Sequence, residues 1–445
     1  MSHDLLLFCH RLAFVCFVGV AVLLVYAVIG SGQRHAFWSR GLIWFGVIGL
    51  CIGVFLGRLA PAVSPIALNP DEFQTLAQAQ HYLSHQIPWA HVDGVTVGPV
   101  NSYFLTGLLA LGFPPSTLTA RLAASLLCIT SIIGLAVFLQ RLYGPLIAVL
   151  SVFPWAAALA FAPESDYQHY ASELPSIALL ASALALFPLH AQGRMGRLVI
   201  AGVLLGLVPF TKLQAAPLAA FLAGAGSFLI LFREQTQKLV KLGVFSLAVL
   251  GPGLALLLVV WMSGALPDFF HSYLSIGDRY QSRGGPGIMH FFERSGILQW
   301  PLAVSFVLAL FALIQGLYRA VQKNYQDSWF FLLLLLWVGM VGMIIMAPGV
   351  FFQHYLLFLM LIGPLMMAHS LSRSFRASLI PAHPWPRFVM IFVLLLSSPT
   401  LERAFGLTLP RFASREWRFD RYLNPMIEQE HMGAGGLERF VWRKF

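Results

Sequence analysis

The sequence is poor in charged residues. Asp, Glu, Lys and Arg account for 10% of its 445 residues, whereas ordinary soluble domains contain about 25%. Hydrophobic residues account for 58%. This composition excludes an ordinary soluble enzyme, and it indicates that lipid surrounds most of the chain.

Cysteines and nucleotide-binding motifs are also scarce. The four cysteines, Cys9, Cys16, Cys51 and Cys128, lie inside apolar segments and lack the spacing of metal ligands, so we interpret them as small apolar residues. The sequence has no glycine-rich loop of the P-loop type. A nucleotide-linked substrate is therefore not indicated.

Basic residues outnumber acidic residues, 28 to 18, which gives a formal net charge of +10. In a soluble protein this excess would suggest nucleic-acid binding. Here the basic residues gather in every second turn between apolar segments, as the positive-inside rule describes for membrane proteins. The charge therefore argues against nucleic-acid binding and predicts an orientation, with basic turns in the cytoplasm and both termini outside.

Apolar segments of about 15–25 residues recur along the chain, and this length crosses the roughly 30 Å hydrocarbon layer of a bilayer. Because backbone polar groups must be satisfied internally there, each segment is expected to be a helix. The sequence thus predicts an all-α polytopic membrane protein with about twelve transmembrane helices. The segments lie at about 5–30, 41–58, 117–139, 145–162, 176–190, 198–213, 215–232, 242–262, 299–318, 328–347, 355–371 and 387–400.

These segments predict one transmembrane domain over residues 1–400 and a short external tail over 401–445. Three external connections are long enough to carry function, and loops are where functional residues concentrate. They lie at about 59–116, 163–175 and 263–298.

Asp71 and Glu72 are adjacent acids in an acid-poor protein. They follow Asn69 and Pro70, which suit a helix cap and a first helical residue, with Glu72 at the capping-box position. We therefore expect interfacial helices in the first long loop. Two roles fit the acids. They complement the positive end of the helix macrodipole, or they are catalytic carboxylates.

The second external loop concentrates acids beside a histidine. Glu164, Asp166 and His169 are followed by Glu173 within ten residues. Two carboxylates separated by one residue suit a hard divalent cation such as Mg²⁺ or Mn²⁺ and leave room for phosphate oxygens. The alternative is a polar turn wetted at the membrane surface. Glu164, Asp166 and His169 are candidate metal ligands.

Five further residues are candidates for binding the phosphate of a donor substrate. Lys212 lies at the outer end of an apolar segment, Arg279 and Arg283 precede a glycine-rich run in an external loop, and His354 and Tyr355 open a late segment. Cationic side chains bind phosphate oxygens. The alternatives are snorkelling for Lys212, lipid headgroups for the arginines and membrane anchoring for the His-Tyr pair.

The order of these features resembles the GT-C class of membrane glycosyltransferases, which includes protein O-mannosyltransferases and the lipid A aminoarabinose transferase. The resemblance covers most of residues 55–370. It rests on Asp71-Glu72, the acidic loop 164–173, the stretch 206–212, and residues 353–355 with Pro364 behind them. The sequence departs from the class in having an extra early helix and in lacking a large external C-terminal domain.

The resemblance implies that the first-loop aspartate is the catalytic base or positions the acceptor. It also implies that second-loop acids bind a divalent metal in some members, and that external basic residues receive the phosphate of the donor, commonly a polyprenyl-phosphate sugar. We therefore expect an inverting glycosyltransferase of a bacterial inner membrane, with its site facing the periplasm or exterior and a glycan, lipid or protein as acceptor. A secondary transporter is the main alternative, because about twelve spans are common there; transporters, however, place ionisable residues near the midplane. A non-catalytic lipid-binding or assembly protein is a third possibility.

Overall fold

A computed structural model describes eleven parts of the chain, and the structural statements below refer to these parts. Within them the protein is helical and has no β-strand; the only β pairs are isolated bridges, Pro88 with Val92 and Val97 with Lys212. The described residues are 3–29, 36–64, 68–84, 87–92, 97–162, 164–187, 194–233, 236–275, 314, 336–345 and 352–376.

Six helices in this part of the chain are long and apolar enough to cross a membrane, and four shorter apolar helices accompany them. They coincide with ten of the predicted apolar segments, so the all-helical fold is confirmed, and six of its helices could cross a membrane. The count of about twelve spans stays a prediction, because segments 299–318 and 387–400 lie, apart from residue 314, outside the described residues. The six are Leu5–Ala27, Trp44–Val63, Thr117–Tyr143, Leu213–Phe232, Lys238–Met262 and Gln353–Ser372, and the four are Pro145–Phe161, Glu173–Leu186, Met195–Phe210 and Leu336–Ile345.

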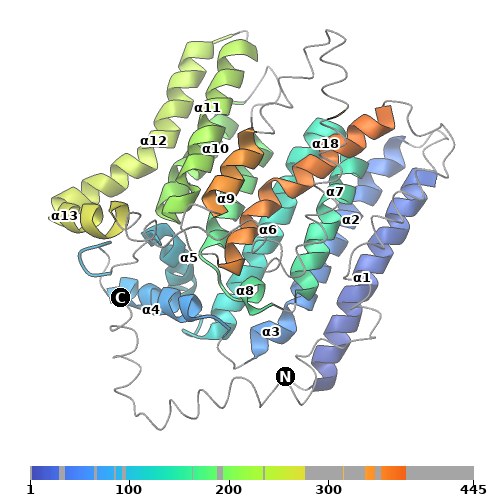
Figure 1. The fold of residues 1–445 in the computed structure, drawn as a ribbon, viewed down its shortest axis with the longest axis horizontal. Helices are drawn as coiled ribbons and strands as arrows, with labels where there is room; N and C mark the ends of the chain where they lie inside the picture. Colours follow the sequence, from blue (N-terminus) through green and yellow to red (C-terminus); the bar gives the residue numbers. More distant parts are fainter. Residues whose placement is uncertain are drawn as a thin grey trace.

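The long helices form one bundle (Figure 1). Helix α7 lies at its centre, buried along most of its length against α2, α6 and α18. Small residues let such helices approach closely. On α10, a Cβ added to Gly206 would lie 2.1 Å from the carbonyl oxygen of Val249 on α12. The bundle helices are α1 (His3–Ile29), α2 (Ala36–Gly57), α6 (Thr117–Tyr143), α7 (Pro145–Phe161), α9 (Glu173–Leu186), α10 (Met195–Leu207), α11 (Ala216–Arg233), α12 (Lys238–Met262) and α18 (Gly363–Arg376).

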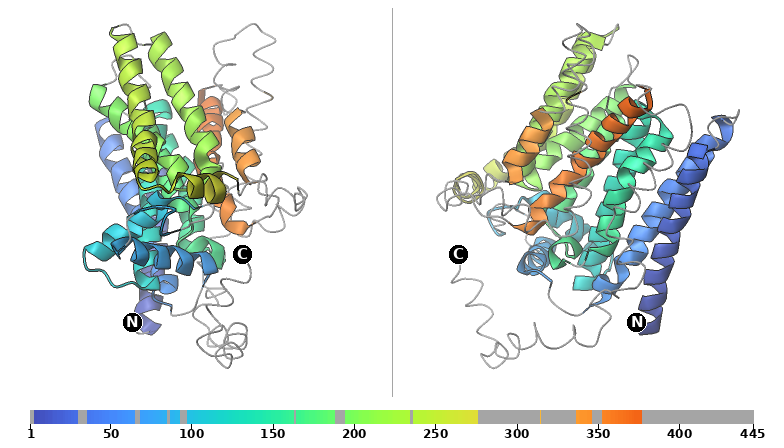
Figure 2. Two further views of the ribbon diagram at one scale, coloured as in Figure 1. Left: turned by 90° about the vertical axis from the view of Figure 1, so that its left-hand side faces the viewer. Right: turned by 45° about the vertical axis from the view of Figure 1, so that its right-hand side comes forward.

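Short helices gather toward one end of the bundle. Those of the first long loop lie in the lower part of Figure 1, and those that follow α12 lie at its left edge, at the lower end of α12; Figure 2 shows the same arrangement. The ends of α6 and α11 and the starts of α7 and α12 lie at the opposite end. The fold therefore separates the acid-rich loops from two of the basic turns, as the charge pattern predicts. The short helices are α3 (Leu59–Val63), α4 (Pro70–Ser84), α5 (Pro99–Ala110), α8 (Ser165–Gln168), α13 (Leu266–Asp268) and the π-helix η4 (Phe269–Leu274).

The chain between α10 and α11 is broken. Two 3₁₀ turns, η2 (Val208–Phe210) and η3 (Leu213–Ala215), flank Lys212, whose backbone is extended. The amide of Gly98 donates a 2.9 Å hydrogen bond to the carbonyl of Thr211. Only glycine fits there, because a Cβ on Gly98 would lie 2.1 Å from the carbonyl oxygen of Phe210. This contact fixes Lys212 against the first long loop.

Candidate functional site

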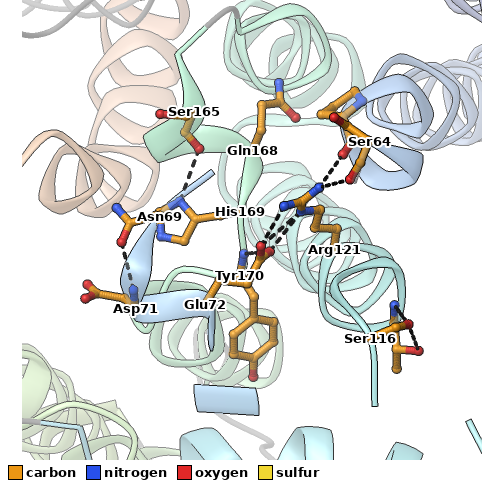
Figure 3. Close-up of polar contacts among 12 residues, drawn as sticks. Ser64, Asn69, Asp71, Glu72, Ser116, Arg121, Ser165, Gln168, His169 and Tyr170 are labelled. Atoms are coloured by element: carbon orange, nitrogen blue, oxygen red, sulfur yellow. Dashed lines mark hydrogen bonds and ion pairs between the residues drawn. The ribbon is translucent and has the colours of Figure 1, made fainter. Parts of the chain in front are cut away.

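The first turn of α4 begins as the sequence predicts. Asn69 Oδ1 accepts a 2.9 Å hydrogen bond from the amide of Asp71, which caps the helix. Asn69 Nδ2 donates a 3.0 Å hydrogen bond to Asp166 Oδ1. A single side chain thus caps α4, as Figure 3 shows, and also joins the first long loop to the acid-rich second loop.

Glu72 points away from its own helix end. Its fully buried carboxylate accepts hydrogen bonds from Arg121 Nε (3.1 Å to Oε1 and 3.0 Å to Oε2), from Arg121 Nη2 (2.8 Å) and from the amide of Tyr170 (3.1 Å). The capping-box prediction is therefore wrong for this side chain, because a buried guanidinium forms stronger, charge-assisted hydrogen bonds than the end of α4 does. This is the geometry of a structural ion pair (Figure 3).

Two buried arginines, Arg58 and Arg121, hold the loops of the site. Arg58 donates to the carbonyls of Tyr167 (2.7 Å) and Gln168 (3.1 Å) in α8. Arg121 also donates to the carbonyl of Ser64 at 2.6 Å. Sequence reasoning missed both residues. The signal that could have found them is their position, because Arg121 lies inside an apolar segment and Arg58 ends one. Charged residues are rare there, and they usually have a function or a charged partner.

His354 lies at the centre of the acidic cluster. It is the second residue of η6 (Gln353–Leu361), a 3₁₀ helix. Its Nδ1 lies 3.5 Å from Asp166 Oδ2, and its Nε2 lies 3.8 Å from Asp71 Oδ2 and 3.9 Å from Glu173 Oε1. These distances are long for hydrogen bonds, so attraction to the carboxylates depends on the imidazole being protonated. Three carboxylates from three elements thus converge on one imidazole.

Glu173 and Lys212 form a second buried ion pair, between Oε1 and Nζ. Lys212 Nζ also donates a 2.7 Å hydrogen bond to Ser172 Oγ and lies 4.7 Å from the centre of the Tyr355 ring, a cation–π distance. The structure therefore brings three predicted donor-binding residues, Lys212, His354 and Tyr355, to one place.

The other two predicted donor-binding residues, Arg279 and Arg283, lie outside the described residues.

Asp166 is held in its ionised form. Burial alone would raise the pKa of its carboxyl, but the nearby positive charge of His354 and the hydrogen bond from Asn69 outweigh burial and lower this pKa to about 2. Glu164, two residues earlier, is the N-cap residue of α8.

The described residues contain no group of three His, Cys, Asp or Glu side chains placed to hold a metal ion. The assignment of Mg²⁺ or Mn²⁺ to Glu164, Asp166 and His169 stays a prediction from the sequence.

His169, in the same acid-rich loop as Asp166, is fully buried. Its Nδ1 lies 3.1 Å from the carbonyl oxygen of Ser165, whereas its Nε2 has no hydrogen-bond partner among the residues that the structure describes. Burial, helped by the charge of His354, lowers the pKa of His169. Its ring lies edge to face with that of His354, with centroids 5.7 Å apart.

The carboxylates of the site differ in their access to solvent. The Asp71 side chain is 47% exposed and that of Asp166 is 22% exposed, whereas Glu72 and Glu173 are fully buried in ion pairs. Among these four, Asp71 is therefore the carboxylate most open to solvent.

No known family model matches this sequence, and no curated protein matches it. The function must therefore be argued from the chemistry of the site.

Proposed function

We propose that this protein is an inverting membrane glycosyltransferase that moves a sugar from a polyprenyl-phosphate donor to a glycan, lipid or protein acceptor. The observation that carries the proposal is the half-exposed carboxylate of Asp71. It stands beside a buried cluster of His354, Asp166, Glu173 and Lys212 at one end of a bundle of apolar helices. A carboxylate open to solvent beside cationic groups suits proton abstraction next to a phosphate leaving group.

In the proposed reaction, an acceptor hydroxyl approaches Asp71. Its proton moves to Asp71 as its oxygen forms a bond with the anomeric carbon of the donor sugar. The bond between that carbon and the phosphate oxygen breaks, and the electron pair leaves with the lipid phosphate. Attack opposite to the leaving group inverts the anomeric configuration.

The remaining residues divide between supporting the base and receiving the phosphate. Glu72 holds α4 through Arg121 and thereby fixes the position of Asp71. His354, Tyr355 and Lys212 form one wall of the site, and Arg279 and Arg283 belong to the external loop that would meet the donor phosphate. A divalent metal held by Glu164, Asp166 and His169 would add positive charge at the leaving group.

The donor's lipid chain requires a site at the membrane surface. We place this site on the external, periplasmic side of a bacterial inner membrane, because the acidic loops lie opposite two of the basic turns and basic turns are normally cytoplasmic. A polyprenyl-phosphate sugar supplies an activated donor on that side, where nucleotide sugars are absent.

The test is sugar transfer by purified Asp71→Asn protein. Asn is nearly isosteric with Asp but cannot accept the proton, so transfer should fall by about 100-fold or more, while folding and membrane insertion stay normal. Asp268→Asn is the matched control, because Asp268 is an exposed acid in the first turn of another short helix. Near-normal transfer by Asp71→Asn would refute the assignment of the base. Mass spectrometry of surface glycans from a deletion strain would name the sugar.

A secondary transporter is the second candidate, and one observation favours it. The break between α10 and α11 places the buried Lys212 at irregular backbone, where it pairs with the buried Glu173 at the start of α9. Transporters bind substrates at discontinuous helices. Reconstituted vesicles distinguish the two functions. Uptake of a polar solute without any sugar transfer would favour the transporter.

A further inference from the structure

The neutral form of His169 has one defined tautomer in this structure. Its Nδ1 lies 3.1 Å from the carbonyl oxygen of Ser165. A carbonyl can only accept a hydrogen bond, so Nδ1 carries the hydrogen and Nε2 presents a lone pair. That lone pair is fully buried and has no partner. Buried acceptors are almost always satisfied, and an exception calls for a physical explanation.

The neighbours of His169 do not satisfy Nε2. Asp71 and Asp166 are carboxylates, and ionised carboxylates only accept hydrogen bonds. The amide of Asn69 donates to Asp166 instead. In Figure 3 the His169 ring points from Ser165 toward the first turn of α4, where Asn69 and Asp71 lie. Among the described residues no hydrogen-bond donor is placed at Nε2. A hydroxyl of a molecule bound in the same site would supply it.

We propose that His169 determines sugar specificity by accepting, through Nε2, a hydrogen bond from one hydroxyl of the bound sugar. This inference rests on the proposed function and assigns a new role to one residue of that site. A hydroxyl needs a single acceptor here, which the structure provides. A divalent metal shared with Glu164 and Asp166, as the sequence predicts, is the competing use of this lone pair, and the chelator experiment below separates the two.

The ligand reaches this lone pair from the side of Asp71, the most exposed carboxylate of the cluster. The ring of Phe352 stacks on that of His354, with centroids 5.4 Å apart and planes 13° apart, and Phe352 is itself exposed. A sugar that displaces Phe352 from this stack comes beside both imidazoles. Sugar rings pack well on such apolar and aromatic surfaces.

Two substitutions test the roles of the two ring nitrogens of His169 separately. The amide of Asn reaches about as far as Nδ1, so His169→Asn keeps a donor for the carbonyl of Ser165 and removes Nε2. The amide of Gln reaches about as far as Nε2, so His169→Gln keeps an acceptor there and loses the bond to Ser165. His369→Asn is the control for replacing a buried histidine, because His369 contacts Tyr143 on another part of the bundle.

The assay uses full-length protein in lipid nanodiscs with polyprenyl-phosphate-linked mannose, glucose and arabinose as probes. For the sugar that the wild-type protein transfers, His169→Asn should lower kcat/KM by about 10- to 100-fold while its melting temperature stays near that of the wild type. His169→Gln should melt lower yet retain more transfer. His369→Asn should transfer like the wild type.

Monodeoxy donors identify the hydroxyl. The wild type should discriminate by a similar factor against one donor that lacks a single hydroxyl, and His169→Asn should not, because the acceptor for that hydroxyl is gone. Unchanged discrimination or wild-type kcat/KM in His169→Asn would overturn this inference alone. The inference would also be overturned if a chelator abolished the activity of the wild type and if the activity of His169→Asn no longer depended on Mg²⁺ or Mn²⁺. A wild type that transfers none of the probes would overturn the proposed function as well.

Discussion

Replacing Arg121 with methionine removes the partner of Glu72 and keeps a long, flexible side chain. The guanidinium makes three hydrogen bonds to the Glu72 carboxylate and further bonds to the carbonyls of Pro61 (3.0 Å) and Ser64 (2.6 Å). All of these disappear in Arg121→Met. Glu72 then stays fully buried with the amide of Tyr170 as its remaining donor from this group.

The expected cost follows from that unpaired charge. Removing one partner of a buried ion pair typically costs about 3–5 kcal/mol, because the other charge stays desolvated. Replacing both partners with apolar residues is often close to neutral. The double variant Glu72→Met/Arg121→Met should therefore be more stable than Arg121→Met alone, although it carries one more substitution.

The free energy of unfolding can be measured by denaturant titration in detergent micelles. Arg141→Met is the matched control. Arg141 is only partly buried and donates to the carbonyl of Ala185 at 2.6 Å, so its loss should cost less than the loss of Arg121. The reasoning fails if Arg121→Met lies within about 1 kcal/mol of the wild type, or if the double variant is the less stable of the two.

Three further predictions use other parts of the site. A cysteine at Ser165 should react with an impermeant reagent from outside, and one at Gln237 should not; labelling of Ser165 only from the cytoplasm would reverse the site's orientation. Chelation, or Asp166→Asn, should lower sugar transfer, and full activity in both cases would remove the metal from the reaction. Because the fold lowers the pKa of Asp166 from 3.8 to about 2, its contribution to stability is complete above about pH 5 and is lost as pH falls through 2. Asp166→Asn should therefore reduce the fall in melting temperature between about pH 5 and pH 2. The same fall in the variant and in the wild type would contradict this.

Local signals predicted local structure correctly. The start of α4 follows from Asn69 and Pro70, because a cap and a first helical residue act within one turn. Most apolar segments likewise became helices, since length and composition alone determine whether a segment can cross a bilayer. The predicted second helix of the first loop, α5, is also present.

The sequence did not predict which side chains pair when they lie far apart along the chain. Glu72 was expected to bond its own helix end, but it pairs with Arg121, 49 residues later. From the sequence, Lys212 was interpreted as a lone cation near acidic loops. Nothing indicated that Glu173, 39 residues earlier, is its partner. Such pairs depend on which faces of two helices meet, and that depends on packing across the whole bundle.

The 3₁₀ geometry of η6 determines how far His354 extends. Its nine residues are wound as a 3₁₀ helix, a form that rarely continues beyond three or four residues. A 3₁₀ helix rises about 0.5 Å more per residue than an α-helix, so rewinding the segment from His354 to the end of η6 as an α-helix would draw His354 toward α18 by about 4 Å. That shift is comparable with each of the distances between His354 and its three carboxylates. The helix type of one buried segment therefore contributes to the spacing between the imidazole and the acids.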